Sequence, residues 1–302
     1  MENCGDHRRV CGNLQTMPTN ADRRALLQTL LPEGLPVTKQ WLKKQSPQFD
    51  RHAVDNLLKS NQLRSLAPGV YVRPGTHLTW QGVVAALESI FGRDLSVGGL
   101  TALELQGFAH YLPLSRQRTV HLYSKAALPA WLNHAIPTVK FIRHNGLSSL
   151  LGLGLVHREY DPVERTLVDV QAPGRQQDFW SVTLSSPERA YLEVLMDVPE
   201  TVSFEHANQL LQGMTTLSPR RMEQLLRKCT SVKVRRLFYW MAERNNYAWF
   251  KKLPAPKALD ALGLGSGNRV LAKDGRLDSK YRITIPEEMW TAPALTTDKS
   301  AS

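Results

Sequence analysis

The sequence predicts an α+β fold in which an N-terminal winged helix-turn-helix is followed by a mixed α/β and helical C-terminal domain. Three observations predict it: three short helical segments precede a β-hairpin, helices and strands alternate in the middle of the chain, and amphipathic helices dominate after residue 186. The length of 302 residues suits two or three domains. We expect domains at 18–75 and 76–290, with a disordered extension at 1–17 and a flexible tail at 291–302.

Three helices are expected in the N-terminal domain. The first two cover residues 20–31 and 39–45, where apolar side chains recur at helical spacing, and Thr38 can cap the second. The third begins with a serine–proline pair, a typical helix start, and is expected at residues 46–61. One face of this third helix is apolar and the other is polar, so it can pack on the domain and still face a ligand.

A β-hairpin is expected directly after the third helix. Residues 63–66 and 70–73 are rich in β-prone side chains and flank an Ala-Pro-Gly turn. Three helices followed by a hairpin are the order of a winged helix-turn-helix, whose third helix enters the DNA major groove while the hairpin touches the backbone. The alternative is a winged helix that binds only protein, with a polar face that is merely solvated.

The polar face of the third helix carries side chains suited to reading DNA. Arg51 could pair with guanine, and Asn56 or Gln48 with adenine. Lys59 could hold a phosphate, and basic residues of the hairpin could act as wing contacts. The predicted DNA-binding residues are Thr38, Lys39, Lys43, Gln48, Arg51, His52, Asn56, Lys59, Arg64 and Arg73.

The rest of the chain is expected to hold an α+β region and then a helical region. Helices are predicted at 80–91, 98–107, 187–197, 203–212, 219–229 and 232–245. Strands are predicted at 119–123, 139–143, 180–184 and 281–285. The glycine-rich run at 263–267 lacks the Lys-Ser/Thr of a phosphate-binding loop and is expected to be a flexible loop.

Positive charge is concentrated in two blocks of the chain. The formal net charge is +11 with an isoelectric point of about 9.7. Nine lysines and arginines face four acidic residues in 18–75, and eleven face three in 205–257. Such clustering favours phosphate contacts, although a generally basic, solvated surface remains an alternative. We expect a basic C-terminal face that extends the DNA surface or meets a toxin, made of Arg220, Arg221, Lys233, Arg235 and Arg236.

Five stretches in the same order resemble the AbiEi-type antitoxins of type IV toxin–antitoxin systems. They lie at residues 63–71, 99–107, 185–190, 232–238 and 280–286. The resemblance implies an N-terminal domain that binds inverted repeats in double-stranded operator DNA and represses its own operon. It also implies a C-terminal domain that counteracts a nucleotidyltransferase-like toxin, without the need for a stable complex. A cytoplasmic protein without membrane contact, cofactor, metal or catalytic residue is the expectation.

Two other functions remain as alternatives, a metal-dependent nuclease of a mobile element and a protein-binding adaptor. The acids Asp161, Glu164 and Asp169 are the densest in the middle domain, but the lysine that a nuclease site would need after them is missing. A structural role is favoured for Arg189, which could pair with a buried carboxylate such as Asp169 or Glu193. The three cysteines lack metal-ligand spacing.

Overall fold

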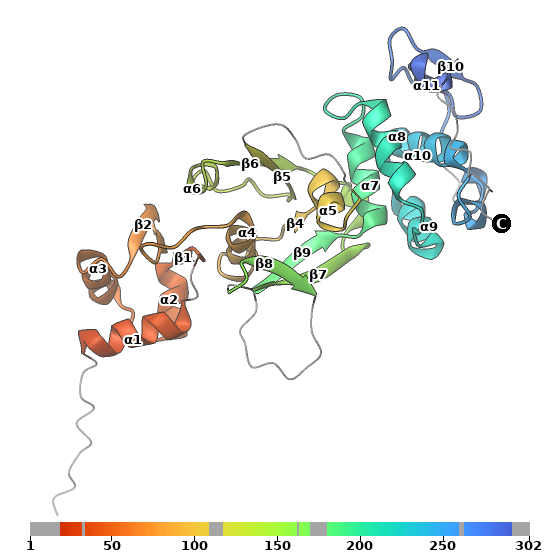
Figure 1. Ribbon diagram of the computed structural model, residues 1–302. Coiled ribbons are helices and arrows are strands. Elements are labelled where there is room, and N and C mark those ends of the chain that lie inside the picture. Colours follow the sequence, from red (N-terminus) through yellow and green to blue (C-terminus); the bar gives the residue numbers. More distant parts are fainter. Residues whose placement is uncertain are drawn as a thin grey trace, which may run out of the picture. The chain divides into compact units, whose positions relative to one another are not determined.

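The computed structural model describes residues 19–31, 34–108, 117–161, 163–169, 180–259 and 263–291. The predicted extension at 1–17 lies outside the described residues, as does all but the first residue of the predicted tail. The chain divides into two compact units between Thr76 and His77 (Figure 1), and each unit is described by itself.

The first unit has the elements of a winged helix-turn-helix, as predicted. In chain order they are α1 (Asn20–Leu30), β1 (Val37–Thr38), α2 (Lys39–Gln45), α3 (Arg51–Lys59), β2 (Arg64–Ala67) and β3 (Val70–Val72). The strands form one antiparallel sheet in the order β1-β3-β2. Strand β1 was not predicted, because two residues leave no periodic pattern and only their pairing with Tyr71 and Val70 makes them a strand.

Side-chain caps set the helix starts in this unit. The hydroxyl of Thr38 accepts a hydrogen bond from the Trp41 backbone N–H at 3.1 Å, so the predicted cap of α2 is present. The predicted start of the third helix at residue 46 is wrong. Asp50 caps α3 instead by accepting from the Ala53 N–H at 2.7 Å, and residues 46–50 form a turn held by the buried Phe49.

The second unit is built on a six-stranded mixed sheet in the order β6-β5-β4-β9-β7-β8. The pairs β5–β6 and β4–β9 are parallel and the others are antiparallel. The strands are β4 (Ser96–Val97), β5 (Arg118–Tyr123), β6 (Val139–His144), β7 (Leu155–Asp161), β8 (Thr166–Asp169) and β9 (Trp180–Ser185). Strands β4, β7 and β8 were not predicted; β7 mixes charged and apolar residues, and most of its side chains are only half-buried.

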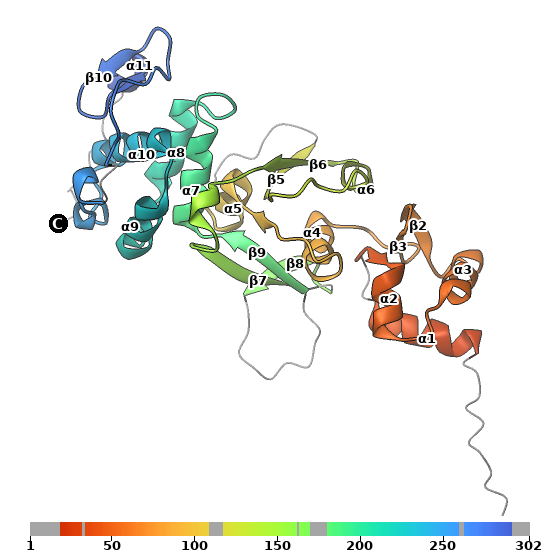
Figure 2. The same ribbon diagram turned by 180° about the vertical axis from the view of Figure 1, so that it is seen from behind.

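Helices cover the sheet and form a bundle beyond it (Figures 1 and 2). Helix α4 (Trp80–Ser89) packs on β9, and α5 (Gly99–Leu105) packs on α7 (Pro187–Met196). The bundle continues with α8 (Phe204–Gly213), α9 (Pro219–Lys228) and α10 (Val232–Asn245). The smaller elements are α6 (Leu132–Ala135), η1 (Ser148–Leu150), η2 (Phe250–Lys252), η3 (Pro256–Ala258), β10 (Arg276–Asp278), β11 (Ile283–Ile285) and α11 (Glu288–Thr291).

A buried carboxylate joins the sheet to the bundle. Oε1 of Glu193, on α7, accepts from Arg189 Nε at 2.8 Å and from the Ser185 hydroxyl at 3.0 Å. Its Oε2 accepts from the Gly99 N–H at 3.0 Å. Gly98 must lack a side chain, since a Cβ there would lie 2.3 Å from this Oε2. The predicted structural role of Arg189 is therefore confirmed, with Glu193 as its partner.

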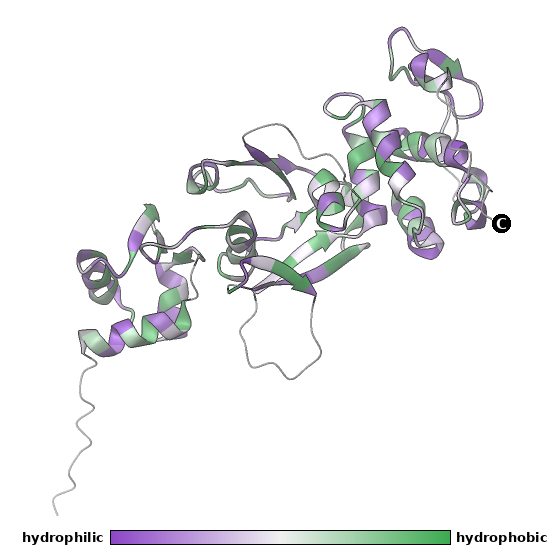
Figure 3. Cartoon of the chain, viewed as in Figure 1, coloured by the Kyte–Doolittle hydropathy of each residue, from purple (hydrophilic) through white to green (hydrophobic). Residues whose placement is uncertain are grey.

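Hydrophilic and hydrophobic residues both occur along the helices α1, α3 and α9, as the colours of Figure 3 show. The buried hydrophobic residues of α7 to α10 belong to one cluster, which also takes in Ile283 and Ile285 of β11. Among the described residues, no helix is both long enough and apolar enough to cross a membrane.

Candidate nucleic-acid interface

Helix α3 presents one polar face to solvent. Its buried residues are Ala53, Val54 and Leu57. Its exposed side chains are Arg51, His52, Asp55, Asn56 and Lys59. At about 100° of rotation per residue these five fall within an arc of roughly 140°. The structure thus brings four predicted DNA-binding residues together on one face of α3: Arg51, His52, Asn56 and Lys59.

The cap of α3 is itself charged. The Ala53 N–H lowers the pKa of the Asp50 carboxyl, burial opposes this, and the nearby His52 and Arg23 lower the pKa further. Asp50 therefore stays ionised at neutral pH and suits the positive end of the helix dipole. This cap holds Arg51 and His52 in the first turn, the part of a recognition helix that contacts base edges.

Helix α1 adds two arginines that were not among the predicted DNA-binding residues. Arg23 and Arg24 line a cavity of about 250 Å³ together with Asn56, Lys59 and Ser60. The charge of the N-terminal block included both arginines, but helical spacing within α1 alone could not place them beside α3. The packing of α1 on α3 does so.

The remaining predicted DNA-binding residues have mixed surroundings. Lys43 on α2 and Arg64 on β2 are exposed, whereas Lys39 is half-buried. Arg73 donates from Nη1 to the Leu31 carbonyl at 3.3 Å and so links the end of the hairpin to α1. Gln48 is half-buried in the turn before α3, so the prediction that it lies on this helix is wrong.

The predicted basic C-terminal face does not form, because Arg235 and Arg236 are each only 1% exposed. Arg235 donates from Nη1 to the Gly263 carbonyl at 3.0 Å. Arg236 donates from Nε to the Leu264 carbonyl and from Nη1 to the Arg282 carbonyl, both at 2.8 Å. These bonds hold the glycine-rich run, which was expected to be a flexible loop, against α10.

The other three residues of that predicted face also differ from one another. Lys233 is half-buried and donates to the Val198 carbonyl at 2.7 Å. Arg221 is exposed but pairs with the buried Glu188 at 3.2 Å. Arg220 is exposed on α9. The second block of positive charge is therefore partly used inside the bundle and is not one surface for phosphate.

Two of the three acids considered for a nuclease site, Asp161 and Asp169, serve a turn and an ion pair instead. Oδ1 of Asp161 accepts from the Val163 and Glu164 backbone N–H groups at 2.8 and 3.1 Å. Asp169 pairs with Arg158 across the β7–β8 ladder. In the part of the chain that the structure describes, no three histidine, cysteine or acidic side chains come together in a way that could hold a metal ion.

The fold defines the class of this protein: a winged-helix unit followed by a second unit with a mixed sheet and a helical bundle. One family model, described as the AbiEi antitoxin N-terminal domain of a transcriptional regulator, matches residues 20–114. A second, described as a transcriptional regulator and AbiEi antitoxin of a type IV toxin–antitoxin system, matches residues 117–286. The chain belongs to this AbiEi family of antitoxin transcriptional regulators, which is generally non-enzymatic.

A solved structure shares the fold. The crystal structure of the RV2827C protein from Mycobacterium tuberculosis aligns with a TM-score of 0.50 at 15% sequence identity, and the alignment covers 88% of this chain and 91% of that chain. No curated protein matches the sequence.

Proposed function

We propose that the first unit binds double-stranded operator DNA with inverted repeats and that the protein thereby represses its own operon. The observation that carries the proposal is the exposed face of α3, where side chains that can pair with bases stand beside side chains that can hold phosphates. Arg23 and Arg24 extend the same face with positive charge. In winged helices this is the helix that enters the major groove.

The test is a mobility-shift titration of the full chain on its own upstream DNA. The double variant Arg51→Ala/Asn56→Ala should weaken operator binding by about 1–3 kcal/mol for each lost base contact. The matched control is Lys140→Ala, which removes one positive charge from an exposed position on β6 of the second unit. Unchanged operator affinity in the double variant would show that α3 is not the reading helix.

We also propose that the second unit supplies the antitoxic activity and that its functional partner is a nucleotidyltransferase-like toxin. Two points support this: the family is that of type IV antitoxins, and the second unit has a large core of its own. A stable complex with the toxin is not required for this activity.

Separation of the two activities can be tested in growing cells. The Arg51→Ala/Asn56→Ala variant should lose repression of a reporter but still rescue the growth of cells that express the toxin. Rescue that disappears together with repression, in a variant shown by circular dichroism to be folded, would refute the division of labour. Co-purification with the tagged toxin would show separately whether a stable complex forms.

A further inference from the structure

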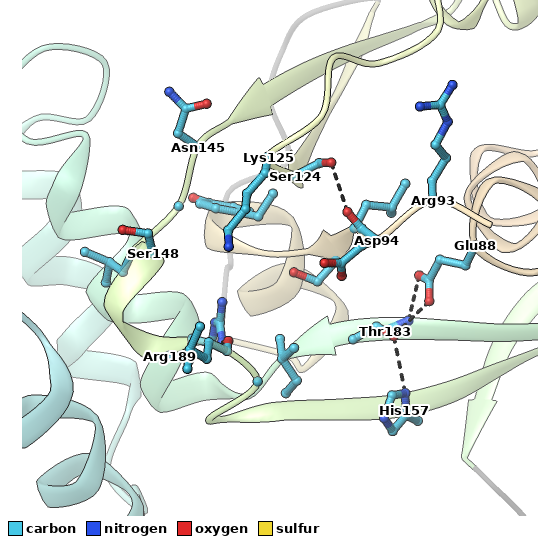
Figure 4. A pocket seen from close by; sticks show the side chains of 18 residues that line it. Glu88, Arg93, Asp94, Ser124, Lys125, Asn145, Ser148, His157, Thr183 and Arg189 are labelled. Atoms are coloured by element: carbon cyan, nitrogen blue, oxygen red, sulfur yellow. Dashed lines mark hydrogen bonds between the residues drawn. The ribbon is translucent and has the colours of Figure 1, made fainter. Parts of the chain in front are cut away.

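A pocket of about 380 Å³, lined by both polar and apolar side chains, lies in the second unit (Figure 4). Part of its wall follows the carboxyl ends of the parallel strands β5 and β6, at Ser124, Lys125, Asn145 and Ser148. The crevice at the carboxyl ends of parallel strands is where open α/β sheets bind ligands. The mixed sheet of this unit offers the same type of position.

Arg189 supplies a fixed positive charge in the pocket wall. Its side chain is 8% exposed, and Nε binds Glu193 while Nη1 donates to the Leu151 and Leu153 carbonyls at 2.7 and 2.8 Å. The other terminal nitrogen, Nη2, takes no part in this network. Figure 4 shows the guanidinium end of Arg189 pointing into the pocket. The arginine is thus held in place before any ligand arrives.

Lys125 supplies a second positive charge in the pocket wall. In Figure 4 its amino group points into the pocket, toward Arg189. Arg143 fixes the loop that carries it, since Nη1 donates to the Ser124 carbonyl at 3.2 Å and to the Asn145 side-chain oxygen at 2.7 Å. Two cations, one on the loop after β5 and one on helix α7, therefore face one space.

Leu151 shows that the loop between β6 and β7 is under strain. Its backbone has φ 46° and ψ −131°, which is rare for a residue with a side chain, and the residue is 73% exposed in the pocket wall. Such strain costs about 1–3 kcal/mol and concentrates at ligand sites. In this backbone conformation the Leu151 carbonyl accepts from Arg189. The Leu151 side chain provides an apolar surface in the same pocket wall as the two cations.

The acidic residues of the wall lie on its other side. Burial raises the pKa of Glu88 to about 7, although its oxygens accept from the Thr183 N–H and hydroxyl, both at 2.8 Å. Asp94 is also part of the wall, and repulsion between the two carboxyl groups contributes to the raised pKa of Glu88. Near neutral pH Glu88 is about half protonated, so it repels an anion less than an ordinary carboxylate would.

We propose that this pocket binds a small phosphorylated molecule, with the phosphate between Lys125 and Arg189 and with its uncharged part on Leu151. Two converging cations suit a dianion. The inference concerns the second unit alone and does not depend on operator binding by α3.

Calorimetric titration of the full chain tests the proposal with three probes: inorganic phosphate, AMP and adenosine. Saturable binding of phosphate or AMP, without binding of adenosine, is expected. AMP that binds at least about tenfold more tightly than phosphate would identify a nucleotide as the better occupant, whereas equal affinities would identify the phosphate alone as the recognised group. No saturable binding up to about 10 mM, or equal binding of adenosine and AMP, would overturn the proposal.

Variants locate the binding site. Lys125→Ala should weaken phosphate or AMP binding about tenfold or more, and Ser148→Asp should abolish it by placing a negative charge in the wall. Lys140→Ala, which removes an exposed charge outside the pocket, should bind as the parent does. Equal losses in the Lys125 and Lys140 variants, or no loss in the Lys125 variant, would overturn the assignment. Thermal unfolding of each variant confirms that it is folded.

Discussion

Helices α3 and α10 both carry arginines in basic stretches of the chain, but they use them in opposite ways. Arg51 on α3 is exposed to solvent, whereas Arg235 and Arg236 on α10 are buried. The buried pair donates to carbonyls of a segment that has little secondary structure of its own, so its charge serves the fold. A count of positive residues therefore identifies a binding surface only where no other part of the chain covers them.

The largest effect is expected from removing a buried arginine. Arg236→Met deletes two hydrogen bonds of 2.8 Å from a buried charge: the Leu264 carbonyl loses this donor, and the Arg282 carbonyl keeps only the Arg269 N–H at 2.9 Å. The free energy of unfolding should fall by about 3–4 kcal/mol, measured by urea denaturation. Arg220→Met, an exposed change on α9, should stay within about 0.5 kcal/mol of the parent. Equal small changes in both variants would remove the contrast between buried and exposed arginines.

A buried carboxyl group should make stability depend on pH. The pKa of Glu88 rises from its ordinary value of 4.5 to about 7, chiefly because of burial. The folded protein therefore holds a proton that the unfolded chain releases, and stability falls as the pH rises from about 4.5 to 7. The expected loss is roughly 2–3 kcal/mol over this range.

Glu88→Gln isolates this effect, because an amide can still accept from the Thr183 N–H and does not ionise. The difference in unfolding free energy between variant and parent, measured by urea denaturation from pH 5 to 8, should shift in favour of the variant as the pH rises. A difference that is constant across this range would show that Glu88 titrates normally in the folded protein.

The helix cap of α3 should have a smaller effect. Asp50→Ala removes the acceptor of the Ala53 N–H and should destabilise the first unit by about 1 kcal/mol, measured by thermal or urea unfolding. Asp50→Ser should restore most of the loss because serine is also a good cap. Asp55→Ala is the control, since Asp55 is an exposed acid on the same helix that caps nothing. A similar loss in the Asp55 variant would speak against capping as the cause.

The smallest effect concerns the salt dependence of operator binding. If Lys59 contacts a phosphate, Lys59→Ala should reduce the slope of log affinity against log salt by about 0.9, with sequence preference unchanged. Arg220→Ala, in the second basic block, should leave the slope as it is. A reduced slope in the Arg220 variant would show that α9 also contacts DNA, although Arg235 and Arg236 of the same basic block are buried.

Local sequence alone predicts much of the secondary structure of this protein and its family. The order of three helices and a hairpin, the cap at Thr38, and the extents of α7 and α10 depend on side-chain periodicity and capping within a few residues. The resemblance to the AbiEi family rests on five short stretches, and the family models that match the chain confirm it. The polar face of α3 follows from the same helical spacing.

Only the tertiary structure decided what the charged residues contact. Helix α3 begins at Arg51 and not at the predicted residue 46, because Asp50 caps it. Two-residue strands such as β1 form only by pairing with a neighbouring strand. Arg235 and Arg236 are buried because the segment from Gly263 onward packs over α10, a contact between residues distant in the sequence. Periodicity shows which side chains share a face of one helix. Whether that face is buried depends on which other part of the chain packs against it.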